Sequence, residues 1–142
     1  MLRNIDPILS PEILFTLRAM GHGDAIVLAD ANFPGTSTCE RCLRADGSDA
    51  SDMLRAILSI MPLDTFVDDP ALTMQVVGDS SVIPEAVQDF QSIIDESADA
   101  PRPIQSLERF AFYERAAGAF AVVQTGERRL YGNIILKKGV IS

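Results

Sequence analysis

Basic residues are scarce in this sequence, which has 12 lysines and arginines against 20 aspartates and glutamates and a net charge of -8 at pH 7. Nucleic-acid affinity depends on Lys and Arg side chains that neutralise phosphates, so this balance opposes a nucleic-acid partner and disfavours anionic membranes. Long apolar runs are also missing: no stretch approaches the roughly 20 residues of a membrane-spanning helix, and the first residues contain no apolar leader segment. We therefore expect a cytoplasmic protein with neither a nucleic-acid nor a membrane partner.

Cysteine is nearly absent, since Cys39 and Cys42 are the only two. Their spacing is used by thioredoxin-like redox centres and by half of a tetrahedral zinc site, but there is no second pair and the surrounding loop is rich in Pro, Gly, Ser and Thr. We favour reduced thiols without a role, and keep a redox pair and a metal site between subunits as alternatives.

The hydrophobic fraction of 47% can fill a core without metals or disulfides, so residues 1–142 are expected to form one domain.

Helical and strand patterns alternate along the chain. Ser10-Pro11-Glu12 is typical of a helix start, and Gly21 is expected to end that helix in a left-handed conformation. Further helices are predicted from residue 51 to the stop at Pro62, from residue 84 to residue 94 and over residues 108–117. Strands are predicted over residues 25–29, 72–77, 104–107, 119–124 and 133–136, the last two pairing across the turn between them. This order predicts an α/β layered fold, with a mostly parallel central sheet flanked by helices and an antiparallel element at the C-terminus.

The single histidine, His22, lies between Gly21 and Gly23 in a predicted helix-to-strand connection. Its side chain is the only one with an ordinary pKa near neutrality, which makes it a candidate for proton transfer. Asp30 directly follows the predicted strand 25–29, and ligands of open α/β sheets collect beyond the carboxyl ends of strands. A histidine that only packs, and an aspartate that only caps a turn, are the alternatives for these two residues.

Two further segments carry polar groups among apolar ones. In the predicted helix 108–117, Arg109 and Tyr113 can point polar tips into a pocket, although aromatic residues at this spacing usually belong to a core. In Tyr131-Gly132-Asn133, glycine permits close approach of the backbone to a ligand, and asparagine offers both donors and an acceptor. Taken alone, this second segment is also typical of an ordinary hairpin turn.

Several motifs occur in order along nearly the whole chain: His22-Gly23-Asp24, Asp30-Ala31-Asn32-Phe33-Pro34, Arg44-Ala45-Asp46-Gly47, Pro62-Leu63-Asp64, Arg109-Phe110-Ala111-Phe112-Tyr113-Glu114-Arg115-Ala116, and the run from Thr125-Gly126-Glu127 to Tyr131-Gly132-Asn133. In these motifs the sequence resembles the L-fucose mutarotase branch of the ribose pyranase and fucose mutarotase family. The ribose branch has histidine at the position of Arg109 and often alanine at that of Gly132, so both positions favour fucose. The resemblance implies an isomerase that interconverts the α and β anomers of L-fucose.

The resemblance also implies roles for particular residues. His22 would be the proton donor, and Tyr113, which like Asp64 matches a position implicated in the animal relatives, would be a second catalytic candidate. The residues expected to bind the sugar are Asp30, Asp64, Arg109, Tyr131, Gly132 and Asn133. Opening the sugar ring requires a proton at the ring oxygen and the loss of one from the anomeric hydroxyl, so no cofactor or metal is expected.

Members of this family form ring-like homo-oligomers, described as homodecamers of two pentameric rings with sites at subunit contacts, and the resemblance implies the same assembly here. A mean hydropathy of +0.16 is compatible with apolar surface buried between subunits. Two alternative functions stay open. One is a D-ribose pyranase that exchanges pyranose and furanose forms, and the other is a monosaccharide-binding accessory protein without catalysis.

Overall fold

Eleven helices and strands make up the fold in the computed structural model, which describes all of residues 1–142. In chain order they are α1 (Pro11–Ala19), β1 (Ala25–Ala29), α2 (Gly35–Thr38), β2 (Cys42–Ala45), α3 (Ala50–Leu58), β3 (Ala71–Met74), α4 (Glu85–Ser97), β4 (Gln105–Leu107), α5 (Arg109–Ala117), β5 (Ala121–Thr125) and β6 (Ile134–Lys137). None of the helices combines the length and the apolar composition that crossing a bilayer requires.

The six strands form one mixed sheet in the order β2-β5-β1-β6-β3-β4. β1 and β2 both pair parallel with β5, and β3 pairs parallel with β4. β6 runs antiparallel between β1 and β3. The prediction of a mostly parallel sheet with an antiparallel element at the C-terminus is therefore confirmed.

The expected pairing of the last two strands is wrong, because β1 lies between β5 and β6. β1 is apolar on both faces, and its residues from Ile26 to Ala29 are fully buried. Such a strand is satisfied only when other strands bond to both of its edges and helices cover both of its faces. The segment between Thr125 and Ile134 accordingly crosses over the carboxyl end of β1 instead of forming a tight hairpin.

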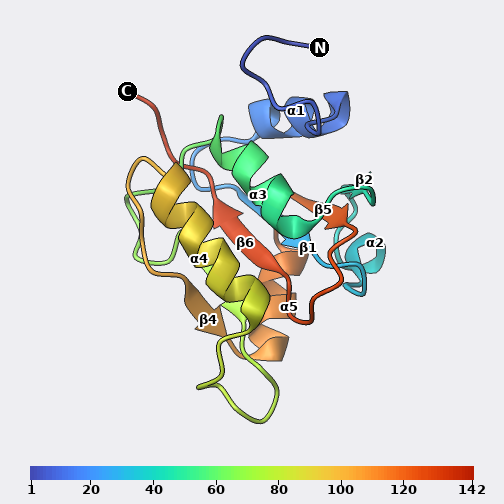
Figure 1. The fold of residues 1–142 in the computed structure, drawn as a ribbon, viewed down its shortest axis with the longest axis vertical. Helices are drawn as coiled ribbons and strands as arrows, with labels where there is room; N and C mark the ends of the chain where they lie inside the picture. The colour runs from blue at the N-terminus through green and yellow to red at the C-terminus, as the bar shows by residue number, and fades with distance from the viewer.

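Helices cover both faces of the sheet, and successive side chains of β1 point into the two layers in turn. Ile26 and Leu28 belong to the larger core, which α1, α3 and α4 cover, whereas Val27 and Ala29 belong to a smaller core beneath α5 and α2. In Figure 1, α3 and α4 lie in front of the sheet and α5 lies behind it. The molecule is thus a three-layer α/β/α domain.

Local differences from the sequence expectation occur where the patterns are short. The sequence pattern does not predict β2, which is a four-residue strand at the edge of the sheet without a buried side chain. Helix α3 begins earlier than expected, because Asp49 is its N-cap and accepts a hydrogen bond from the backbone N–H of Asp52 at 2.7 Å. After α1, Gly23 rather than Gly21 takes the positive φ, at 84°.

Candidate active site

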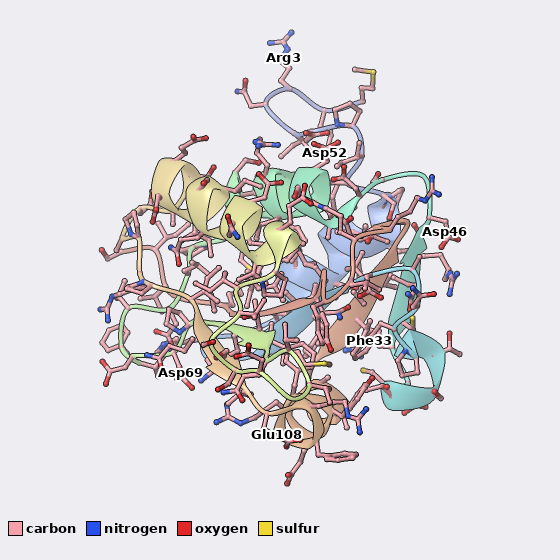
Figure 2. All side chains as sticks on the ribbon, turned by 60° about the horizontal axis from the view of Figure 1, so that its bottom comes forward. Arg3, Phe33, Asp46, Asp52, Asp69 and Glu108 are labelled. Atoms are coloured by element: carbon pink, nitrogen blue, oxygen red, sulfur yellow. The ribbon has the colours of Figure 1, made fainter.

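The predicted site residues lie at the two opposite ends of the strands, so that the sheet has one group along each of these two borders. His22 precedes β1 and Asp30 follows it. The four steps along this strand, at about 3.3 Å each, separate its ends by about 13 Å. Asp30, Arg109, Tyr131, Gly132 and Asn133 lie at the edge where the parallel strands end, which we call the carboxyl edge, and His22 and Asp64 lie at the opposite, amino edge. Phe33 and Asp69, which come from these two different ends, are labelled on opposite sides of the view in Figure 2.

The carboxyl edge is built around Asp30 and Asn133, which are 6% and 4% exposed. The backbone N–H of Asp30 donates to Asn133 Oδ1 at 2.7 Å, and Asn133 Nδ2 donates to Asp30 Oδ2 at 3.0 Å. The backbone N–H of Asn32 donates to Asp30 Oδ1 at 3.0 Å. Both side chains are therefore fixed by the protein before any ligand arrives.

Burial raises the pKa of Asp30 above its ordinary value, because desolvation disfavours the charged carboxylate. Hydrogen bonds from Asn32, Asn133, Phe33 and Gly132 oppose this effect without overcoming it. A carboxyl group with a raised pKa takes up and releases a proton closer to neutrality than an exposed one does. Asp30 can therefore serve both as a hydrogen-bond partner for a hydroxyl group and as a proton acceptor.

Tyr131 combines an unusual backbone with an anchored side chain. Its φ of 59° lies in the left-handed region, which costs a residue other than glycine on the order of 1 kcal/mol or more. Its hydroxyl accepts a hydrogen bond from the backbone N–H of Val77 at 3.1 Å, which leaves the hydroxyl proton free to be donated. The ring thereby connects the 126–133 segment to the loop that follows β3.

Arg109 is the first residue of α5 and is exposed at the same edge. Its guanidinium lies 4.7 Å from the centre of the Phe110 ring and forms no ion pair or hydrogen bond within the chain. Together with residues of the 75–80 loop, it lines a hollow of about 400 Å³. Five donor positions of this side chain are thus available to a ligand.

Tyr113 lies one helical turn after Arg109, in the layer behind the carboxyl edge. Its ring stacks on Phe33, with centroids 5.5 Å apart, and its hydroxyl has no hydrogen-bond partner in the chain. The expectation that this aromatic segment packs in a core holds for Phe112, which is fully buried, but not for Phe110, which is 67% exposed. Tyr113 therefore combines a packing role with a free hydroxyl.

The amino edge holds a histidine and aspartate pair. His22 Nε2 lies 3.0 Å from Asp64 Oδ1, and the side chains of His22 and Asp64 are 44% and 3% exposed. Burial would raise the pKa of Asp64, but hydrogen bonds from Phe66 N–H and His22, and the positive charges of His22 and Lys137, together hold it below its ordinary value. Asp64 thus stays ionised at neutral pH and is a hydrogen-bond partner for the His22 ring.

This pairing decides which nitrogen of His22 can act. Asp64 engages Nε2, so Nδ1 is the nitrogen that remains for a ligand. A neutral ring that donates from Nε2 has an unprotonated Nδ1 and accepts a proton there, whereas the imidazolium donates one. The same atom can therefore deliver a proton and take it back.

The turn that carries His22 is fixed by the end of β6. Gly23 N–H donates to the carbonyl of Lys138 at 2.8 Å, and Lys138 N–H donates to the carbonyl of Asp24 at 2.9 Å. The backbone N–H of Asp64 donates to the carbonyl of Lys137 at 3.0 Å. The backbones that carry His22 and Asp64 are thus both hydrogen-bonded to the C-terminal end of β6.

Sequence reasoning gave no role to the residues that hold the end of β1. Thr125 Oγ1 donates to the carbonyl of Ala29 at 2.7 Å, and Gln124 Nε2 donates to the carbonyl of Asp30. Gln124 Oε1 is buried beside Gly35 and has no hydrogen-bond partner. The side-chain amide is therefore oriented so that its nitrogen donates to Asp30 while its oxygen stays without a hydrogen bond. Thr125 belongs to a motif that carried the family resemblance, and no sequence signal marked Gln124.

The cysteine pair does not join either edge. Cys39 is buried and donates weakly to the carbonyl of Ala119 at 3.6 Å, while Cys42 is half-buried at the start of β2. Both are free thiols. No group of three or more His, Cys, Asp or Glu side chains is placed to hold a metal ion.

The fold and the two edges define a layered α/β protein with a buried polar cluster at one end of its strands and a histidine and aspartate pair at the other. The chain belongs to the RbsD / FucU transport protein family, whose model matches residues 3–141. It is 50% identical to the fucose mutarotase of Mus musculus over 99% of this chain and 95% of that protein, and 46% identical to that of Homo sapiens with the same coverage. The solved fucose mutarotase of Streptococcus pneumoniae in complex with L-fucose superposes with a TM-score of 0.92 at 45% identity, covering 99% of this chain and 100% of that one. The resemblance seen in the sequence is confirmed.

Proposed function

We propose that the protein is an L-fucose mutarotase, an isomerase that interconverts the α and β anomers of the free sugar. The observation that carries this proposal is the prearranged Asp30 and Asn133 pair, together with the unpaired Arg109 guanidinium at the same edge of the sheet. Hydroxyl-rich ligands are selected by such convergent polar groups. The identity to proteins named fucose mutarotase, 46% to 50% over nearly the full length, supports the choice of sugar.

The chemistry needs one proton delivered and one removed. Protonated His22 donates to the ring oxygen through Nδ1, and Asp64 stabilises the charged ring. Asp30 accepts the proton of the anomeric hydroxyl as the bond between the anomeric carbon and the ring oxygen breaks, which gives the open-chain aldehyde. The aldehyde rotates, and the reverse steps re-form that bond and close the ring. The sugar is neither oxidised nor reduced overall. Positioned acid-base groups of this kind contribute about 10²–10⁴-fold to a rate.

The remaining residues bind the sugar in this proposal. Arg109 and the hydroxyl of Tyr131 donate to sugar oxygens, and Gly132 lets the backbone approach the ring closely. Tyr113 offers its free hydroxyl as a relay for a proton. Arg109 presents a planar fork of five donors, unlike the histidine of the ribose branch, and we attribute the preference for fucose over ribose to this difference in donor geometry.

The site is completed by a second copy of the chain. About 13 Å of β1 separates His22 from Asp30, so one sugar ring cannot touch both residues of a single chain. Exposed apolar side chains flank both edges: Phe66 beside His22 is 72% exposed, and Phe110 and Leu130 at the carboxyl edge are 67% and 72% exposed. A contact between the amino edge of one subunit and the carboxyl edge of the next is heterologous, and such contacts form a ring when the rotation between neighbours closes. The homodecamer of two pentameric rings is such an assembly.

Saturation-transfer NMR between the anomeric proton signals of L-fucose tests the function. Catalytic amounts of the protein should accelerate exchange for L-fucose and much less for D-ribose. Faster exchange between the pyranose and furanose forms of D-ribose would instead indicate a ribose pyranase. Binding of L-fucose without acceleration would indicate an accessory binding protein, and sedimentation as a monomer would contradict the ring.

A further inference from the structure

The segment of residues 126–133 carries three of the sugar-binding groups but contains no helix or strand. Asn133 and Tyr131 are tied down by their own side chains, to Asp30 and to Val77. The backbone between β5 and Tyr131 needs other anchors. Glu127 and Arg129 are the side chains of this segment that reach back into the domain.

Glu127 is 3% exposed, and both oxygens of its carboxylate are hydrogen-bonded. Oε1 accepts from the backbone N–H of Arg129 at 2.9 Å and from Arg129 Nε at 3.0 Å. Oε2 accepts from Arg129 Nη2 at 2.9 Å and from the backbone N–H of Ala50, the first residue of α3, at 3.3 Å. The two side chains thus form a bidentate pair, the geometry in which a guanidinium fits a carboxylate best.

Arg129 extends this pair to a second helix. Its Nη2 donates to Ser51 Oγ at 2.8 Å, and its Nη1 lies 3.4 Å from Asp89 Oδ2. Hydrogen bonds from Arg129 lower the pKa of Glu127, and Glu127 in turn raises the pKa of Arg129, so both groups are charged at neutral pH. The 126–133 segment is therefore attached to α3 and α4 by charged hydrogen bonds.

Glu127 and Arg129 also contact the chain segments that carry Asp30 and Gly132. The backbone N–H of Ala31, next to Asp30, donates to the carbonyl of Glu127 at 2.8 Å. Gly132 lies directly on the pair: a Cβ there would sit 2.6 Å from Glu127 Cγ and 3.0 Å from the carbonyl oxygen of Arg129. Any shift of Glu127 is thus transmitted both to Asp30 and to Gly132.

We propose that Glu127 and Arg129 are positioning residues, which hold Tyr131 and Gly132 beside Asp30 in the geometry that binds the sugar. The proposal rests on the mutarotase function proposed above. An ion pair that is largely buried is by itself weak evidence for stability. The side chains of this pair join the 126–133 segment to α3 and α4, and the backbone carbonyl of Glu127 joins it to Ala31, next to Asp30.

The test compares two neighbouring arginines. Arg129→Lys keeps the charge but cannot form the bidentate pair and reach Ser51 together. Arg128→Lys is the matched control, since Arg128 is exposed and forms no hydrogen bond or ion pair. We expect Arg129→Lys to raise KM for L-fucose and to lower kcat/KM by about ten- to a hundredfold, with a smaller change in kcat. Arg128→Lys should leave both parameters within about twofold.

Circular dichroism and sedimentation check that each variant keeps its fold and assembly. If Arg129→Lys does not fold, Asp89→Ala, which removes the outer acceptor shared by Arg129 Nη1 and Ser51 Oγ, should show the same rise in KM to a smaller degree. A wild-type protein that does not accelerate anomer exchange would overturn the mutarotase function. An active wild type with equal KM for Arg129→Lys and Arg128→Lys would overturn the positioning role, as would a loss of rate that follows only the folded fraction.

Discussion

The carboxyl edge and the amino edge of the sheet are built in different ways. At the carboxyl edge, Asp30 and Asn133 exchange two hydrogen bonds and are almost completely buried. At the amino edge, the His22 side chain is 44% exposed and has Asp64 as its single hydrogen-bond partner. One edge is held by hydrogen bonds within the protein, whereas the other presents a partly exposed imidazole. In the function proposed above, sugar recognition and proton delivery therefore belong to opposite ends of one strand.

Removing the imidazole of His22 should have the largest effect on the rate of anomer exchange. His22→Ala is expected to lower the rate of fucose anomer exchange by about 10²–10⁴-fold, because the acid at the ring oxygen is lost. The unfolding temperature should stay near that of the wild type, since the ring is largely exposed. Saturation-transfer NMR and thermal unfolding give the two values. Undiminished exchange by a pure variant would exclude His22 as the acid.

Mixing two defective variants tests whether the two edges meet between subunits. His22→Ala and Asp30→Ala should each be inactive alone, but co-expressed in equal amounts they should regain about a quarter of the wild-type rate. In a ring with random order, about one contact in four pairs an intact His22 with an intact Asp30. Mixed rings, verified by mass spectrometry, that remain inactive would show that the two residues do not share a site.

Arg109 should decide between two sugars at the carboxyl edge. Arg109→His replaces a permanent charge by the residue type of the ribose branch, and we expect the preference for L-fucose over D-ribose to fall by roughly tenfold. Exchange rates for both sugars measured in parallel give the ratio. An unchanged ratio would mean that Arg109 binds without selecting.

The two buried carboxyl groups should have opposite effects on stability as pH changes. The pKa of Asp30 is raised by burial, so its ionisation destabilises the fold as pH rises from about its ordinary value of 3.8 through its raised value. The pKa of Asp64 is lowered, so its stabilising effect is complete above 3.8 and is lost as the pH falls further.

Asp30→Asn should remove the first change and Asp64→Asn the second. Urea unfolding across the acid range measures both. For each variant, the difference in unfolding free energy from the wild type is plotted against pH. If this difference changes with pH in the same direction for both variants, the contrast between the edges is contradicted.

Helices and strands were predictable from the sequence where their local signals, such as a helix cap or an apolar run, are strong. Ser10 caps α1 as expected, its Oγ accepting from the backbone N–H of Ile13 at 3.2 Å. The five apolar residues of β1 predicted a fully buried strand. The partner order of β5 and β6 was not predictable in this way, because it depends on which strand gains most from burial rather than on the turn between them.

The site was predictable in its residue types and only partly in its arrangement. The place of Asp30 after a strand indicated the carboxyl edge, and the family resemblance supplied Arg109 and Asn133. Contacts such as that between Glu127 and Ala50 join residues far apart in sequence, and no periodicity or spacing encodes them. The same holds for Gln124, whose role depends on the backbone of a neighbouring strand.

β6 reaches both edges of the sheet. It starts directly after Asn133, and at its other end the carbonyl of Lys138 holds Gly23, next to His22. In the proposed ring, this single strand therefore acts as a spacer that sets the repeat distance between successive sugar sites. Two residues added to β6 and to its partner β1 would lengthen that repeat by about 7 Å and leave each acid out of register with the neighbouring sugar. In the proposed ring, the length of these two strands would thus fix the geometry of the whole assembly.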